Sequence, residues 1–197
     1  MLHTLARLYF SLDLHGVDNI PSRGPLLITP NHQTFADPPL VSLAIRRPVH
    51  YMAWNRLFEI PLFGRVIRRL RAFPVDIDSA DPRATREVVR LLQGGAMVMI
   101  FPEAGRSRDG RVGRFKAGAF RLAVSVGAPI LPVTIVGGHA SWPPGRLLPR
   151  PARIAITYHP IERPDPSLEP REAARQLAAR TQQAIVSTLD GQCSRPA

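Results

Sequence analysis

Five short apolar runs, separated by segments of helical pattern, do most to limit the folds open to this chain. The runs cover residues 26–29, 49–53, 96–101, 130–136 and 153–158. Apolar runs of this length, bounded by turn residues and rich in β-branched side chains, are typical of buried strands. None of them reaches the ~18 residues that suggest a membrane-spanning helix. The sequence therefore predicts a globular domain built around a sheet of short strands.

Helical patterns fill the intervals between these runs. Asp81 and Pro82 form a cap and a first helical turn, and residues 117–126 form a helix that Gly127 ends. Pro170 opens a last helix, whose mostly apolar positions recur every three to four residues. Strands that alternate with helices predict a domain of the α/β class.

Length and composition fit one globular domain. The chain has 197 residues, of which 45% are hydrophobic and 21% charged. We expect a single domain over residues 1–190, with residues 1–15 as a short amphipathic lead-in and residues 191–197 as a flexible tail. One cysteine, Cys193, cannot supply a disulfide framework. The formal net charge of +11 predicts an anionic partner, such as a lipid head group, nucleic acid or a phosphorylated substrate.

A first group of polar residues follows the run at 26–29. Asn31, His32 and Asp37 lie where that strand should end, with a helix expected to begin near Pro38. A carboxylate that holds one ring nitrogen of a histidine fixes its tautomer and prepares the other nitrogen as a general base for an alcohol. The alternative is that Asp37 only caps the helix and His32 only satisfies a loop carbonyl.

A second group follows the run at 96–101. Phe-Pro-Glu-Ala-Gly-Arg-Ser occupies residues 101–107, and Lys116, the only lysine, precedes the helix predicted at 117–126. The planar guanidinium of Arg106 suits a phosphate, and the start of a helix favours anions. The alternative is an ordinary basic loop in water.

The two groups together resemble the PlsC-like glycerolipid acyltransferases. Their Asn-His-x-x-x-x-Asp block is matched by Asn31, His32 and Asp37, and their Phe-Pro-Glu-Gly-x-Arg-Ser block is nearly matched by residues 101–107. Further matches are Gly-x-x-Asn-Ile-Pro at 16–21, Phe-Pro-Val-Asp at 73–76 and Pro-Val at 132–133. The resemblance runs from about residue 16 to residue 161.

This resemblance implies a three-layer αβα fold with a mixed central sheet. It implies that His32 is the general base, that Asp37 supports it, and that a lysophospholipid hydroxyl, most simply that of 1-acylglycerol-3-phosphate, attacks the thioester of acyl-CoA or acyl carrier protein. It implies no metal and no bound cofactor. The residues that it assigns to substrate binding are Asn31, Glu103, Gly105, Arg106, Ser107 and Pro132.

Two positions depart from the family pattern. Ala104 and Gly105 stand where Gly-Thr is commonest, and Ile77 stands where many members carry a phosphate-binding arginine. Isoleucine cannot neutralise a phosphate. Either Arg71, Lys116 or another basic residue replaces that arginine, or the acceptor is not the usual lysophosphatidate.

Residues 61–71 form a basic amphipathic pattern whose use the sequence leaves open. Apolar residues lie on one helical face and arginines largely on another: Leu62, Phe63, Val66, Ile67 and Leu70 against Arg65, Arg68 and Arg69. Such a stripe either packs into the core or lies on an anionic bilayer. With the resemblance, it predicts a peripheral, monotopic protein on the cytoplasmic face of a bacterial membrane.

Other classes of function find less support. A nucleic-acid-binding protein would rest on charge alone, because the sequence has no zinc-ligand spacing, RNA-recognition motif or helix-turn-helix phrase. A metal hydrolase is disfavoured because His50, His139 and His159 are scattered without ligand spacing. A catalytically silent lipid-binding relative stays open as an alternative, although the retention of both His32 and Asp37 argues for chemistry.

Overall fold

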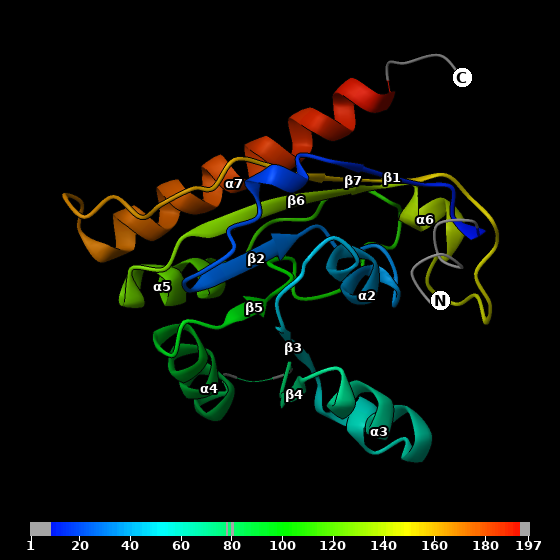
Figure 1. The fold of residues 1–197 in the computed structure, drawn as a ribbon, viewed down its shortest axis with the longest axis horizontal. Helices are drawn as coiled ribbons and strands as arrows, with labels where there is room; N and C mark the ends of the chain where they lie inside the picture. The colour runs from blue at the N-terminus through cyan, green and yellow to red at the C-terminus, as the bar shows by residue number, and fades with distance from the viewer. Residues whose placement is uncertain (1–8, 78, 80, 194–197) are drawn as a thin grey trace.

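A seven-stranded sheet forms the centre of the molecule in the computed structural model, which describes residues 9–77, 79 and 81–193 (Figure 1). Its strands lie in the order β1-β7-β6-β2-β5-β3-β4. Neighbouring strands are parallel except β6 and β7, which are antiparallel. The α/β class and the mixed sheet are thus confirmed. The strands are β1 (Leu12–His15), β2 (Leu26–Pro30), β3 (Val49–Trp54), β4 (Ala72–Val75), β5 (Met97–Met99), β6 (Ile130–Val136) and β7 (Ile154–Tyr158).

Helices and short 3-10 turns surround this sheet. They are α2 (Asp37–Ser42), α3 (Pro61–Arg69), α4 (Pro82–Gln93), α5 (Ala117–Val126), α6 (Gly138–Ser141) and α7 (Pro170–Cys193), with 3-10 turns η1 (Val17–Asn19) and η2 (Asn55–Phe58). Asp81 caps α4 by accepting hydrogen bonds from the main-chain N–H groups of Arg83 and Ala84. Gly127 ends α5 at a φ of 63°, in the left-handed region that glycine adopts readily.

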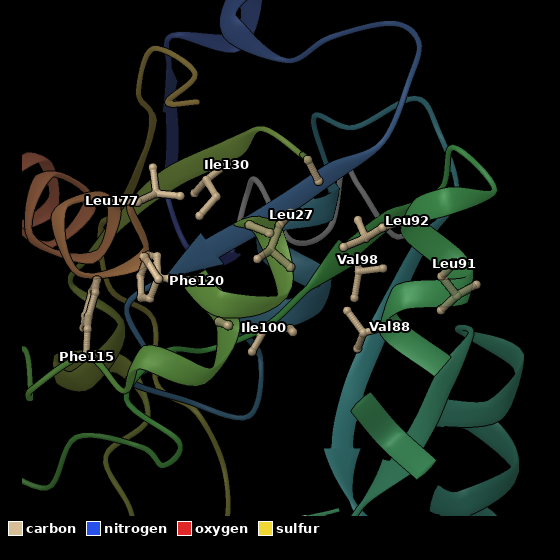
Figure 2. Close-up of a cluster of buried hydrophobic side chains, with 14 of the residues drawn as sticks. Leu27, Val88, Leu91, Leu92, Val98, Ile100, Phe115, Phe120, Ile130 and Leu177 are labelled. Atoms are coloured by element: carbon tan, nitrogen blue, oxygen red, sulfur yellow. The ribbon is translucent and has the colours of Figure 1, made fainter. Parts of the chain in front are cut away.

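Successive side chains of β2 point to opposite faces of the sheet, and apolar ones are buried on both faces. On one face, Leu27 packs with residues of α4, α5 and α7, as Figure 2 shows for Leu92, Phe120 and Leu177. On the other face, Leu26 and Ile28 pack with Leu40 and Val41 of α2 and with apolar residues of the neighbouring strands. The sheet therefore lies between α4, α5 and α7 on one face and α2 on the other.

The two ends of the chain differ from the expectation of a lead-in and a tail. Residues 12–15 are not part of an amphipathic lead-in, because they form β1, which pairs with β7. Leu12 and Leu14 pack on the core while Asp13 between them pairs with Arg153 at 2.8 Å, so the segment has the two-residue period of a strand. At the other end, α7 continues through residue 193 rather than ending near 190. Residues 1–8 and 194–197 lie outside the described residues.

Strand β2 lies in the middle of the sheet, and the site forms at its carboxyl end. The chain leaves β2 through α2 toward β3, and it passes from β5 to β6 through α5, which lies on the opposite face. Crossovers on opposite faces leave the carboxyl ends of the strands between them uncovered, and ligands of α/β sheets bind there. Within the described residues, no helix is long and apolar enough to cross a membrane.

Candidate functional site

Asn31 fixes the loop that follows β2. Its side-chain amide donates to the main-chain carbonyl of Ile135 at 3.0 Å and accepts from the main-chain N–H of the same residue at 2.7 Å. This paired bond ties the end of β2 to β6. Because Asn31 is buried and both ends of its amide are used in this way, the structure gives it a part in shaping the loop, and not a direct contact with a ligand.

His32 and Asp37 come together as the sequence predicted. His32 Nδ1 lies 2.9 Å from Asp37 Oδ2, and the imidazole stacks on the ring of Phe101 with 3.8 Å between ring centroids. The His32 side chain is 17% exposed, whereas that of Asp37 is fully buried. The histidine can thus meet a ligand with one edge while its partner is shielded from water.

The alternative in which Asp37 merely caps a helix is wrong. Helix α2 begins at Asp37 itself, and no side chain caps its first turn. The Asp37 carboxylate reaches back along the chain instead, accepting from the main-chain N–H groups of Gln33 at 2.6 Å and Thr34 at 2.8 Å, and from Thr34 Oγ1 at 2.7 Å. With four donors around it, this buried carboxylate is held in one position.

The surroundings of the imidazole define its tautomer. An ionised carboxylate can only accept hydrogen bonds, so we infer that Nδ1 of His32 carries the proton directed at Asp37. Nε2 of the neutral ring is then a free acceptor, and it has no hydrogen-bond partner among the residues that the structure describes. This is the arrangement that a general base requires.

Glu103 joins the two sequence blocks. Its Oε1 accepts from the main-chain N–H of His32 at 2.8 Å, and its Oε2 accepts from the main-chain N–H of Gly113 at 2.7 Å. Burial raises the pKa of the Glu103 carboxyl, and these two hydrogen bonds oppose that rise. The structure therefore uses Glu103 to hold the loop of His32, whereas the family resemblance had suggested substrate binding.

Arg106 lies on a platform of aromatic rings. Its guanidinium carbon is 3.6 Å from the centroid of the Phe35 ring, and Phe35 meets Trp142 edge to face at 6.1 Å. Burial lowers the pKa of Arg106, and the negative charge of the Asp37 carboxylate opposes that shift. Arginine keeps its positive charge in proteins, and stacking on the Phe35 ring orients the plane of its guanidinium donors.

Three other predicted residues lie on the same loops. The main-chain N–H of Ser107 donates to the carbonyl of His32 at 2.7 Å, and that of Lys116 donates to the carbonyl of Pro102 at 2.8 Å. The side chain of Lys116 is exposed just before α5, and Gly105 is exposed beside Arg106. The structure thus places the basic residues Arg106 and Lys116 on the loops around the His32–Asp37 pair.

Arg71 lies far from these groups, and Pro132 lies inside the sheet beside β2. Arg71 precedes β4, whose first residue, Ala72, is aligned across two further strands with Ile28 of β2. From the spacing of strands and residues, the main chain of Arg71 is roughly 20 Å from that of His32. Pro132 is buried within β6, and its carbonyl accepts from the main-chain N–H of His159.

The end of β4 does not offer a replacement for the missing arginine. Ile77 is 46% exposed there. The hollow beside it is lined by Asp76 and Asp81 as well as by Arg83. Two carboxylates make this region unfavourable for a phosphate.

Two further residues of the site were missed from the sequence. Gln33 accepts from the main-chain N–H of His139 and donates to the carbonyl of Gly110, so it joins three loops. Phe35 supports Arg106. The only available signal was their place inside the Asn-His-x-x-x-x-Asp block.

No group of His, Cys, Asp or Glu suited to a metal occurs within the described part of the chain.

Ala104 adopts a backbone conformation that favours glycine, with a φ of 58°. We expect Ala104→Gly to raise the free energy of unfolding by about 0.5–1 kcal/mol, because the left-handed region costs a residue with a Cβ roughly 1–2 kcal/mol, and the greater freedom of glycine in the unfolded chain offsets about 0.4–1 kcal/mol of that. Urea denaturation would measure this change. Gly105→Ala is the matched control, since Gly105 has no positive φ and open space around its Cα. A midpoint unchanged in Ala104→Gly would contradict the prediction.

Comparison with known proteins places the chain in a family. The sequence model of the family described as Acyltransferase matches residues 11–136. A chloroplastic 1-acyl-sn-glycerol-3-phosphate acyltransferase of Brassica napus is 32% identical over 142 residues, which cover 70% of this chain and 40% of that protein. The 1-acyl-sn-glycerol-3-phosphate acyltransferase of Pseudomonas aeruginosa is 30% identical over 153 residues, which cover 75% of this chain and 58% of the relative. The chain thus spans about half the length of these relatives.

A solved structure extends the similarity to nearly the whole chain. The crystal structure of PlsC, the 1-acyl-sn-glycerophosphate acyltransferase of Thermotoga maritima, aligns with a TM-score of 0.83 and 27% sequence identity. The alignment covers 99% of this chain and 78% of that one. With its match to the family model over residues 11–136, this chain belongs to the acyltransferase family, and within it to the PlsC-like glycerolipid group.

Proposed function

We propose that this protein transfers a fatty acyl group from an acyl thioester to the free hydroxyl of 1-acylglycerol-3-phosphate, which gives phosphatidate. Nε2 of His32 accepts the hydroxyl proton while the oxygen attacks the thioester carbonyl. A C–O ester bond forms, the C–S bond breaks, and the proton passes from His32 to the departing thiolate. No acyl-enzyme is required, because the acceptor itself is the nucleophile.

The observation that carries this proposal is the contact of 2.9 Å between His32 and a buried Asp37, with Nε2 left free. An alcohol is a poor nucleophile until a base accepts its proton, and a positioned base contributes about 10²–10⁴ in rate. Asp37 supports the step by stabilising the imidazolium that forms on His32. The names of the two relatives support the choice of acceptor.

The acceptor phosphate is assigned to Arg106. This guanidinium is stacked on Phe35 and electrostatically coupled to Asp37, and Lys116 lies on a neighbouring loop. Arg71 is too distant, and the end of β4 carries carboxylates. With isoleucine at position 77, Arg106 and Lys116 are the basic residues that we propose for binding the phosphate.

The proposal also covers the acyl donor and the location of the protein in the cell. The donor is acyl-CoA or acyl carrier protein, and the protein acts as a peripheral enzyme at the cytoplasmic face of the membrane. The lipid nature of the acceptor and the net charge of +11 support this place, because cytoplasmic leaflets carry anionic lipids.

Release of free thiol by the purified protein tests the proposed reaction. Acyl-CoA and acyl carrier protein are compared as donors, and lysophosphatidate is compared with a monoacylglycerol as acceptors. Thiol release that depends on lysophosphatidate supports phosphatidate synthesis. Release with the monoacylglycerol alone would show that the acceptor is a neutral lipid, and no release with any pair would favour a silent lipid-binding protein.

Arg106→Ala should raise the KM for lysophosphatidate by about tenfold or more, because a charge-assisted hydrogen bond contributes roughly 1.5–3 kcal/mol. The KM for a monoacylglycerol should change much less. Steady-state kinetics with both acceptors measure the difference. Arg108→Ala is the matched control, since Arg108 is an exposed arginine on the same loop. Equal effects of Arg106→Ala on both acceptors would argue against a phosphate contact.

A further inference from the structure

Helix α3 packs on the protein through the face that carries Gly64, its only buried residue. Gly64 is buried, and a Cβ added there would lie 2.5 Å from the main-chain oxygen of Phe58. The main contacts of α3 are with η2 and with the edge strand β4. In Figure 1 the helix stands at the periphery of the molecule, beyond β4. The bare face at Gly64 lets the helix lie close to η2 without using its apolar stripe.

The apolar stripe of α3 consequently faces water. Leu62 is 75% exposed, Val66 46% and Leu70 48%. Phe63 and the preceding Ile60 are also exposed. Surface helices of soluble domains normally turn such a stripe toward the core, and a contiguous exposed apolar patch marks an interaction site. Ile67, the remaining residue of the stripe, is partly buried. The structure thus decides between the two uses that the sequence left open, because the other four residues of the stripe are exposed and do not pack into the core.

Positive charge surrounds this stripe. Residues 55–71 contain five arginines and one glutamate, Glu59. Arg65 and Arg69 are exposed, and neither takes part in an ion pair with any residue that the structure describes. Arg68 is directed onto the Phe58 ring, with 5.0 Å from its guanidinium carbon to the ring centroid. An apolar stripe bordered by unpaired cations fits a partner with an apolar interior and an anionic surface.

We propose that α3, through Leu62, Phe63, Val66 and Leu70, docks the protein on an anionic lipid bilayer, with Arg65 and Arg69 at the head groups. The proposal rests on the proposed function, because that reaction draws its acceptor from a bilayer. A second copy of the chain fits the stripe less well, because a symmetric contact would place the arginines of both copies together. Charged head groups and acyl chains satisfy both parts of the surface at once.

Flotation of the full chain with lipid vesicles tests the docking surface. The vesicles consist of phosphatidylcholine with or without phosphatidylglycerol, and the wild type should float with the anionic ones. Leu62→Gln with Val66→Gln should weaken this binding about tenfold or more, since two exposed apolar anchors are lost. Arg65→Gln with Arg69→Gln should weaken binding to the anionic vesicles only.

Matched controls carry the same changes elsewhere on the surface. Leu147→Gln with Leu148→Gln removes two exposed leucines from another loop, and Arg83→Gln with Arg86→Gln removes two exposed arginines from α4. Both control pairs should bind as the wild type does. The four residues changed in α3 are exposed, so thermal unfolding should confirm that those variants remain folded.

Two outcomes would overturn the docking proposal. One is vesicle binding by the α3 variants that equals that of the wild type. The other is a dimer in sedimentation that the Leu62→Gln and Val66→Gln changes dissociate while vesicle binding persists. Turnover of a short-chain lysophosphatidate dissolved as monomers should be unchanged in the α3 variants. Failure of that turnover in the wild type would count against the proposed reaction, whereas vesicle flotation tests the helix independently.

Discussion

His32→Ala should lower the turnover of lysophosphatidate about 10²–10⁴-fold, because the substitution removes the atom that accepts the hydroxyl proton. The fold should persist, since Asp37 keeps its hydrogen bonds from the main chain and the hydroxyl of Thr34 and from the main chain of Gln33. Thiol release under saturating donor measures the loss. Thermal unfolding and vesicle flotation should match the wild type.

The control for this variant is His15→Ala, which removes an exposed histidine at the end of β1. It should turn over at the wild-type rate. Unaltered turnover in His32→Ala would remove this residue as the base, and the mechanism would have to be sought in another group. A loss that accompanied a fall in melting temperature would point to a structural role instead.

Asp37→Asn should lower turnover by roughly 10²–10⁴-fold while the chain still folds, because a neutral amide cannot stabilise the imidazolium that forms on His32. Its amide oxygen can still accept from the main-chain N–H groups of Gln33 and Thr34, which Asp37 binds at 2.6 and 2.8 Å. Kinetics and calorimetry on the same preparation separate the two properties. Wild-type turnover in this variant would show that the charge of Asp37 is not needed.

Asp37→Ala is the informative companion to that variant. It leaves two buried main-chain N–H groups without an acceptor, and each such group costs about 1–3 kcal/mol. The free energy of unfolding should therefore fall as well as the turnover. If turnover fell while the free energy of unfolding stayed the same, water would be replacing the carboxylate as the hydrogen-bond acceptor in the loop.

Much of the fold could be predicted because its buried strands and helices show clear apolar patterns over several consecutive residues. Strand β6 and helix α5 have the bounds expected from apolar runs and from Gly127. Strand β1 was missed because its alternation of Leu12, Asp13 and Leu14 is too short to stand out. Strand β4 was missed because Pro74 argues against a strand, yet an edge strand tolerates proline.

The site was predictable where chemistry and spacing coincide, as in His32 and Asp37. The sequence could not show that Glu103 spends both carboxylate oxygens on main-chain N–H groups, since that depends on how two loops meet. Nor could it show that Arg71 lies just before β4 and far from His32 and Asp37, because a sequence does not give the stagger of parallel strands. The outward stripe of α3 depends on Gly64, whose packing partner only the structure identifies.

The bridging carboxylate of Glu103 ties the main chain of His32 to the loop that follows β5. The loop that carries Arg106 holds the main chain of His32 from both sides, through Glu103 at the N–H and Ser107 at the carbonyl. Under the proposed function, the guanidinium that binds the acceptor phosphate and the base that accepts the hydroxyl proton thus belong to one hydrogen-bonded unit. Binding energy from the phosphate would then contribute to the alignment of His32 with the reacting hydroxyl.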